Sequence, residues 1–232
     1  MILASIGDTV DSPRTKNSLL SRIAARFLSW GITSLARLLT AVRPDWQGAD
    51  PASERRRIYF VNHVSHGDFV LVWSVLPLRQ RLATRPVAGA DYWCKGTLRR
   101  FIGERVFNAV LIDRNPRASG TNPIGQMAEA LDQDASLILF PEGTRNLDDV
   151  DLLPFKSGLF RLAQERPDVD LVPVWIDNLN RVLPKGAFIP VPLMCKVIFG
   201  APIHLQDGEA KPDFLNRARD ALLALRPQTE TE

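Results

Sequence analysis

The sequence is poor in the residues that build metal clusters and disulfide frameworks. Its 232 residues include only two cysteines and three histidines. Cys94 and Cys195 stand far apart and in no metal-ligand spacing, so neither a zinc motif nor a disulfide scaffold is expected. The first eleven residues lack a basic segment followed by an apolar core, so no secretory signal is expected. Lone thiols without such a signal are typical of a reducing compartment.

Strong charge and long apolar runs are also missing. The formal net charge is only +3, and no basic run is longer than Arg55–Arg57. With no zinc-knuckle spacing and no aromatic-basic RNA signature, nucleic acid is not an expected partner. A mildly positive surface suits anionic partners such as phospholipid headgroups or an acidic carrier protein. The uncharged stretch from Phe27 to Ala36 is too short to span a bilayer, which needs about 20 apolar residues.

A helical period is clear between Leu19 and Val42. Proline at position 44 then predicts the end of this helix, at Arg43. The helix can lie in the membrane interface with its arginines among the headgroups, or dock on the rest of the protein. The positions of the predicted apolar face are Leu20, Ile23, Phe27, Trp30, Ser34, Leu35, Leu38 and Val42. The remaining face carries Arg22, Arg26, Ser29, Thr33, Arg37 and Thr40.

Downstream of this helix, short strand-like and helix-like segments alternate. This alternation predicts an α/β fold with a mixed, largely parallel sheet flanked by helices. Residues 1–50 are predicted to hold the amphipathic membrane-association helix and a linker from Pro44 to Glu54, and residues 51–232 the α/β domain. Predicted strands are 57–61, 85–88, 106–112, 136–140, 169–176 and 194–199. Predicted helices are 69–78, 92–101, 124–131, 157–164 and 214–225.

The first chemically informative cluster follows the strand 57–61 and reads NHVSHGD, from Asn62 to Asp68. His63 and Asp68 are five residues apart, so they meet only if His63 lies in the turn and Asp68 enters the helix. Asp68 would then accept the Nδ1 proton and leave Nε2 free to act as a general base. His63 and His66 also have a spacing seen in metal sites, but no third ligand lies nearby in the sequence.

The second cluster follows the strand 136–140 and reads FPEGTR, from Phe140 to Arg145. Gly143 permits a sharp turn, and Arg145 has the geometry to bind a phosphate through paired hydrogen bonds. Taken alone, the same residues also describe an ordinary surface turn with a solvated arginine.

In this order the two clusters resemble the blocks of the glycerolipid acyltransferase family, which includes 1-acylglycerol-3-phosphate and lysophospholipid acyltransferases. Between them the family carries an aliphatic-acidic-arginine block, which Val110–Arg114 resembles. Phe155–Gly158 resembles its lysine-glycine turn, and Leu171–Val174 its aliphatic-proline strand. The resemblance extends from about residue 59 to 199. Asn108 departs from the glycine that commonly opens the second block, and residues 69–71 and 91–105 match no subgroup.

The resemblance implies a membrane-associated enzyme that moves an acyl group from a thioester to a lysophospholipid hydroxyl. His63 would be the base and Asp68 its partner, and no enzyme nucleophile, metal or other cofactor would be required. The implied substrate-binding residues are Asn62, Arg114, Glu142, Gly143, Thr144, Arg145 and Lys156. Glu142 would either steady the site or bind a glycerol hydroxyl, and amides of the Gly143 turn would stabilise the oxyanion.

The resemblance leaves several alternatives open. The acyl donor is either acyl-CoA or an acyl carrier protein. The acceptor implied first is 1-acylglycerol 3-phosphate, which gives phosphatidic acid, but glycerol 3-phosphate, lysophosphatidylethanolamine and a lyso-ornithine lipid are alternatives. A thioesterase-like hydrolase and a non-catalytic lipid-binding protein are further alternatives. The expected location is the cytoplasmic face of the inner membrane, with peripheral or monotopic attachment.

Overall fold

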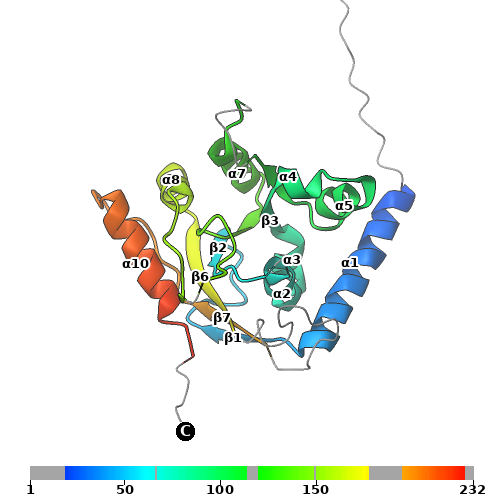
Figure 1. Cartoon of the computed structure of the whole chain (residues 1–232), viewed down its shortest axis with the longest axis horizontal. Coiled ribbons are helices and arrows are strands. Elements are labelled where there is room, and N and C mark those ends of the chain that lie inside the picture. The colour runs from blue at the N-terminus through cyan, green and yellow to red at the C-terminus, as the bar shows by residue number, and fades with distance from the viewer. Residues whose placement is uncertain (1–18, 66, 114–119, 149, 178–194, 228–232) are drawn as a thin grey trace, which may run out of the picture.

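The computed structural model describes residues 19–65, 67–113, 120–148, 150–177 and 195–227. A twisted sheet lies at the centre, with helices packed on both of its faces (Figure 1). The predicted α/β class is therefore confirmed. The two cysteines are free thiols, Cys94 at the surface and Cys195 buried.

The sheet has seven strands in the order β1-β7-β6-β2-β5-β3-β4. All of its pairs are parallel except β6 with β7, so the sheet is mixed and largely parallel, as predicted. The strands are β1 (Arg43–Gln47), β2 (Arg57–Val61), β3 (Thr84–Gly89), β4 (Val110–Ile112), β5 (Ser136–Leu139), β6 (Asp170–Asp177) and β7 (Lys196–Gly200). The central strands β2 and β5 are buried along their whole length, because helices cover both faces.

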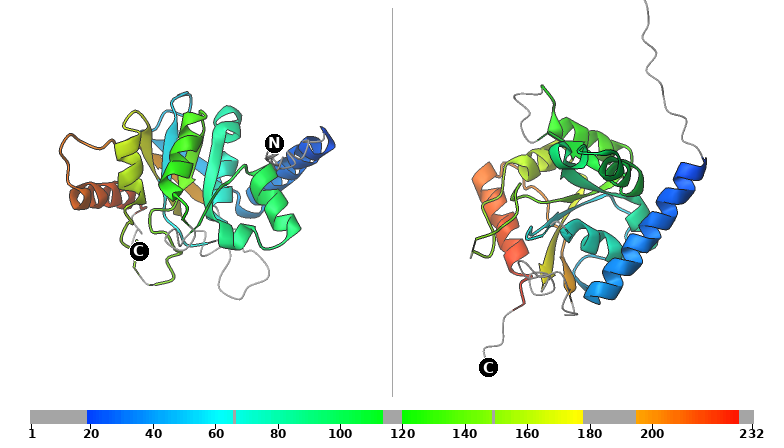
Figure 2. Two further views of the ribbon diagram at one scale, coloured as in Figure 1. Left: turned by 90° about the horizontal axis from the view of Figure 1, so that it is seen from above. Right: turned by 45° about the vertical axis from the view of Figure 1, so that its right-hand side comes forward.

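The helices divide between the two faces, and each set closes its own hydrophobic core (Figure 2). Side chains of α1 (Leu19–Thr40), α2 (Asp68–Val75) and η1 (Ile102–Val106) belong to one core, together with Tyr59 and Val61 of β2. Ile58 and Phe60 belong to the other core, with side chains of α7 (Pro123–Asp132), α8 (Gly158–Glu165) and α10 (Lys211–Leu223). The period-two alternation of β2 thus joins both cores through one strand. The remaining helices are α3 (Leu78–Ala83), α4 (Ala90–Trp93) and α5 (Thr97–Phe101).

Four predicted elements differ from the structure, and the first, helix 69–78, ends at Val75 ahead of Pro77. The linker prediction for Pro44–Glu54 is wrong at its start, because β1 pairs there in parallel with β7. The predicted helix 92–101 is broken into α4 and α5 by Gly96, whose φ of 100° is not helical. The predicted strand 106–112 begins only at Val110, because the apolar residues before it close a π-helix.

Helix α1 shows a docked side and an exposed apolar side. Ala25 and Thr33 are buried, and Leu28, Ile32 and Ala36 pack against the core. Thr33 and Thr40 satisfy their hydroxyls on carbonyls of their own helix, which lets these predicted polar positions face the protein.

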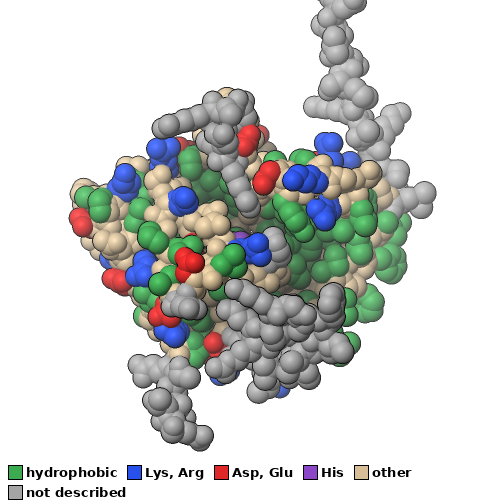
Figure 3. Space-filling view, viewed as in Figure 1, with side chains coloured by type: hydrophobic (Ala, Val, Ile, Leu, Met, Phe, Trp, Pro, Cys, Tyr) green, Lys and Arg blue, Asp and Glu red, His purple; other side chains and the backbone are tan. Residues whose placement is uncertain are grey.

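The bulky apolar residues of α1 point outward instead. Phe27 is 71% exposed, Trp30 72% and Leu38 79%. Figure 3 shows hydrophobic side chains gathered along the side of the molecule where α1 lies. No helix within the described residues is both long enough and apolar enough to cross a membrane.

Candidate active site

The histidine and the acidic residue of the first cluster meet as predicted. His63 lies in the turn after β2, and Asp68 begins α2. His63 Nδ1 lies 2.8 Å from Asp68 Oδ2, and Asp68 is completely buried. The same oxygen accepts the backbone N–H groups of Val64 at 2.7 Å and Ser65 at 2.9 Å. Because an ionised carboxylate only accepts hydrogen bonds, Nδ1 of His63 donates the proton in this pair and Nε2 is left with its lone pair.

The second cluster holds the same histidine from its other side. The Glu142 carboxylate accepts the His63 backbone N–H at 2.8 Å, and the Asn146 N–H donates to the His63 carbonyl at 2.6 Å. The Phe140 ring stacks on the imidazole, with centroids 4.1 Å apart and planes 23° from parallel. His63 is therefore fixed at its backbone and at its ring by residues that follow β5.

Glu142 is buried, and both oxygens of its carboxylate accept hydrogen bonds from the backbone. Its second oxygen accepts the Leu153 N–H at 2.9 Å, and the residue is only 1% exposed. The pKa of its carboxyl lies above the ordinary value because burial disfavours the charge, and the two backbone donors oppose that shift. Of the two roles predicted for Glu142, steadying the site matches this geometry and direct contact with substrate does not.

The geometry argues against the predicted substrate-binding role of Asn62. Its side chain turns to the neighbouring strand, where its amide donates to the Ile176 carbonyl at 3.1 Å and accepts the Ile176 N–H at 2.8 Å. Asn62 is 3% exposed and does not line the pocket. It ties the end of β2 to β6, a role that the strand-end position alone did not reveal.

Gly143 makes the turn that the sequence predicts. Its φ is +69°, and a Cβ at this position would lie 3.0 Å from Cε of Lys156. Glycine therefore lets the Lys156 side chain lie across the turn, where both residues line the pocket. The Gly143 N–H, however, donates to the Phe140 carbonyl at 3.0 Å. It is already used by the turn, which argues against the predicted oxyanion role for this amide.

The remaining predicted residues differ in how far they can be placed. Thr144 and Arg145 lie between Gly143, at the pocket, and Asn146, which bonds to His63. Arg145 makes no ion pair with another described residue, and it does not line the pocket. Arg114 and His66 lie outside the described residues. Among the residues that are described, no cluster of three histidine, cysteine or carboxylate side chains could hold a metal ion.

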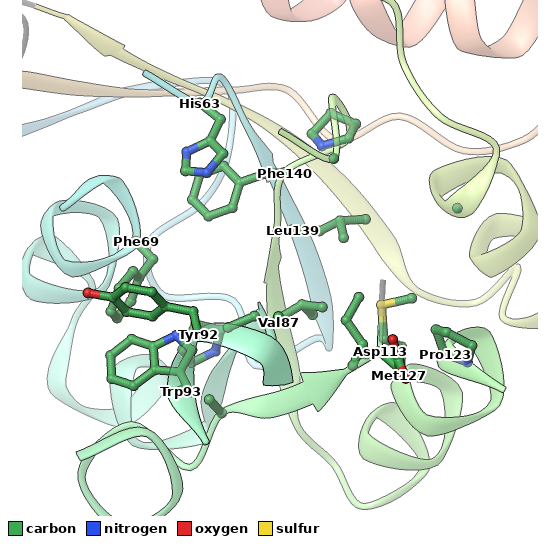
Figure 4. A pocket seen from close by; sticks show the side chains of 18 of the residues that line it. His63, Phe69, Val87, Tyr92, Trp93, Asp113, Pro123, Met127, Leu139 and Phe140 are labelled. Carbon is green, nitrogen blue, oxygen red and sulfur yellow. The ribbon is translucent and has the colours of Figure 1, made fainter. Parts of the chain in front are cut away.

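A pocket of about 800 Å³ opens beside the histidine (Figure 4). His63 and Phe140 lie at one end, while Phe69, Tyr92 and Trp93 form an aromatic wall. Ile32 of α1 and Met127 of α7 also line it, so helices from both core layers close the cavity. This volume is within the usual range for binding sites of small organic ligands. Sequence reasoning missed the pocket because its lining comes from many separate segments.

An α/β sheet that presents a paired histidine and aspartate beside an apolar pocket has the groups that general-base chemistry on a largely apolar substrate requires. The chain belongs to the Acyltransferase family, whose model matches residues 43–177.

Named relatives agree with this family. The 1-acyl-sn-glycerol-3-phosphate acyltransferase of Limnanthes douglasii is 31% identical over 77% of this chain and 62% of its own length. The enzyme of that name from Haemophilus influenzae is 32% identical over 54% of this chain and 52% of its own length. The chain therefore spans about half to three-fifths of these relatives. The crystal structure of the 1-acyl-sn-glycerophosphate acyltransferase of Thermotoga maritima has a TM-score of 0.65 at 19% identity. The match covers 88% of this chain and 80% of that one, and it supports the fold.

The role of Asn62 is tested by Asn62→Ala, which removes both hydrogen bonds to Ile176. We expect a loss of about 1–3 kcal/mol in the free energy of unfolding, because two buried backbone groups lose their partners. Urea unfolding measures this loss, with Gln164→Ala, at an exposed position of α8, as the control that should keep its stability. Unchanged stability together with a raised KM for the acceptor would restore the predicted substrate contact.

Proposed function

We propose that the protein is an O-acyltransferase that moves a fatty acyl group from a thioester to the free hydroxyl of 1-acylglycerol 3-phosphate, giving phosphatidic acid. The observation that carries this proposal is the His63–Asp68 pair, held at one end of an apolar pocket. The names of the relatives support the acceptor.

His63 begins the proposed reaction. Its Nε2 removes the proton of the acceptor hydroxyl while Asp68 stabilises the resulting imidazolium. The acceptor oxygen attacks the thioester carbonyl, the new C–O bond forms and the C–S bond breaks. The imidazolium then returns its proton to the departing thiolate, which leaves His63 neutral for the next cycle.

The pocket is assigned to the acyl chain of the donor, and the cationic side chains are assigned to the phosphate of the acceptor. The aromatic and aliphatic lining suits an acyl chain, whose burial is favoured by about 0.8 kcal/mol per methylene. Arg145 and Lys156, joined by Arg114 on the strength of the family resemblance, suit the acceptor phosphate. Acyl-CoA and acyl carrier protein both present the required thioester, and both remain within the proposal.

We also propose peripheral or monotopic attachment to the cytoplasmic face of the inner membrane. The support is the outward row of Phe27, Trp30 and Leu38 on α1, since aromatic and leucine side chains insert between lipid headgroups. Ile32 of the same helix lines the pocket, so this attachment would set the active site beside the bilayer that holds the acceptor.

The base is tested with His63→Ala in an acyl-transfer assay with acyl-CoA and lysophosphatidate. We expect kcat to fall about 100- to 10,000-fold with little change in fold, because general-base catalysis is lost. Thioester cleavage measured with and without acceptor separates transfer from hydrolysis. A variant that keeps more than about a tenth of the wild-type rate would contradict the role of His63.

The phosphate site is tested with Arg145→Ala. We expect KM for lysophosphatidate to rise about 10- to 150-fold while KM for the donor changes little, because one charge-assisted hydrogen bond is removed. The matched control is Arg161→Ala, which removes one exposed arginine from α8, outside both sequence clusters. A defect confined to the donor would reverse the assignment of the two substrates.

Membrane attachment is tested by changing Phe27, Trp30 and Leu38 together to serine. We expect vesicle partitioning to fall at least about 100-fold, because each inserted side chain contributes about 1.5–3 kcal/mol. Flotation with lipid vesicles measures it, and the control exchanges the exposed Leu147 and Val150 for serine. Equal flotation of the α1 variant and the wild type would place the membrane contact elsewhere.

A further inference from the structure

Two arginines from different helices converge away from the active site. Arg37 of α1 donates from Nη2 to the Ser74 carbonyl at 2.5 Å, and Arg81 of α3 donates from Nη1 to the same oxygen at 3.4 Å. Ser74 lies in the last turn of α2, where the helix dipole is negative. One neutral carbonyl thus holds two guanidinium groups, and neither arginine lines the active-site pocket.

The two charges have no carboxylate partner among the described residues. Arg79, on the same short helix as Arg81, is instead paired with Glu54. The pKa of Arg81 lies below its ordinary value, first because of burial and second because of the charge on Arg37. An anion held between the two guanidinium groups would oppose the second cause directly. The Arg81 guanidinium also lies over the Trp73 ring, 5.5 Å from its centroid, which limits its motion.

Exposed leucines accompany both arginines. Leu38 follows Arg37 and is 79% exposed, while Leu78 and Leu82 lie one turn apart on α3 and are 62% and 74% exposed. A free phosphate would use only the guanidinium groups. A phospholipid has a phosphate for the arginines and alkyl chains for the leucines, so it matches all of these features.

We propose that Arg37 and Arg81 bind the phosphate of an anionic phospholipid in the bilayer, at a site separate from the acceptor site near His63. The planar fork of each guanidinium gives paired hydrogen bonds to phosphate oxygens. The bound lipid would join α1 to α3 across the end of α2. This inference rests on the proposed membrane contact and does not depend on acyl transfer.

The test compares Arg81→Gln with Arg79→Gln, which removes one positive charge from the same helix. Flotation is measured with full-length protein on vesicles of phosphatidylcholine and on an equal mixture of phosphatidylcholine and phosphatidylglycerol. Any positive charge near an anionic surface contributes about 1 kcal/mol to membrane binding. Vesicle binding of Arg79→Gln should therefore fall at most about five-fold. Arg81→Gln also loses a charge-assisted hydrogen bond to the lipid phosphate, so its vesicle binding should fall at least about ten-fold, on the anionic vesicles alone.

Further measurements separate a lipid site from a helix cap and from a site for free phosphate. The thermal midpoint of Arg81→Gln without lipid should stay near that of Arg79→Gln; a lowered midpoint with unchanged flotation means that Arg81 only caps α2, which overturns the site. Equal losses of vesicle binding in Arg81→Gln and Arg79→Gln would mean that only general electrostatic attraction acts, which also overturns the proposed site. A third outcome would assign the site to free phosphate. In that case inorganic phosphate raises the thermal midpoint of the wild type above its value in chloride at equal ionic strength, and it does not raise the midpoint of Arg81→Gln. The Arg81→Gln and Arg79→Gln variants would then float equally.

The same data distinguish this inference from the proposed function. Wild-type protein that floats on neither vesicle overturns the membrane contact and this site with it. Wild-type protein that floats on both vesicles, with Arg81→Gln unaltered, overturns the site alone. Acyl transfer to dispersed lysophosphatidate by wild type and by Arg81→Gln reports separately on the proposed reaction.

Discussion

The parallel register between β2 and β5 is the constraint on which the candidate active site depends. Phe60 lies opposite Leu139, so the two strands end at the same level of the sheet. Residues that follow these strands are 79 positions apart in sequence, yet the His63 N–H meets the Glu142 carboxylate. A shift of one residue in this pairing would turn the side chains of β2 toward the opposite cores. Burial of β2 on both sides therefore protects the position of the base as well as the fold.

The electrostatics of the site follow from the same arrangement. Asp68 is removed from water but receives three donors on one oxygen, which stabilises its charge and fixes the orientation of the imidazole. Glu142 is also buried, and both of its oxygens are used by the backbone. Both carboxylates are buried and so do not reach a substrate in the pocket, whereas Lys156 lines the pocket and Arg145 lies two residues after Gly143, which also lines it. This division between supporting anions and available cations suits a phosphorylated acceptor.

The sequence predicted the elements that have a strong local signal. Buried strands such as 57–61 and 136–139 were identified because both faces are apolar, and the motifs after them marked the site. Side-chain direction was harder, because Asn62 is a neighbour of His63 in sequence and still turns toward Ile176 on β6. The outward row on α1 was predicted as an apolar face, but the docked side carried no such signal because alanines and threonines stand there among Leu28 and Ile32. Strand β1 was missed because Arg43–Gln47 is polar and becomes a strand only through its partner β7.

That edge strand bears on how the chain can be shortened. A fragment that begins at residue 51, the boundary predicted from the sequence, would keep both motifs and lose β1. Strand β7 would then present an unpaired row of backbone N–H and C=O groups from Lys196 to Gly200, of which all but the first residue are buried in the intact protein. Unprotected edges of this kind recruit strands from other molecules, and the usual result is aggregation. A fragment that begins before Arg43 keeps β7 paired and leaves the polar strand β1 at the edge of the sheet, so the exposed edge is formed by five residues that belong to neither motif.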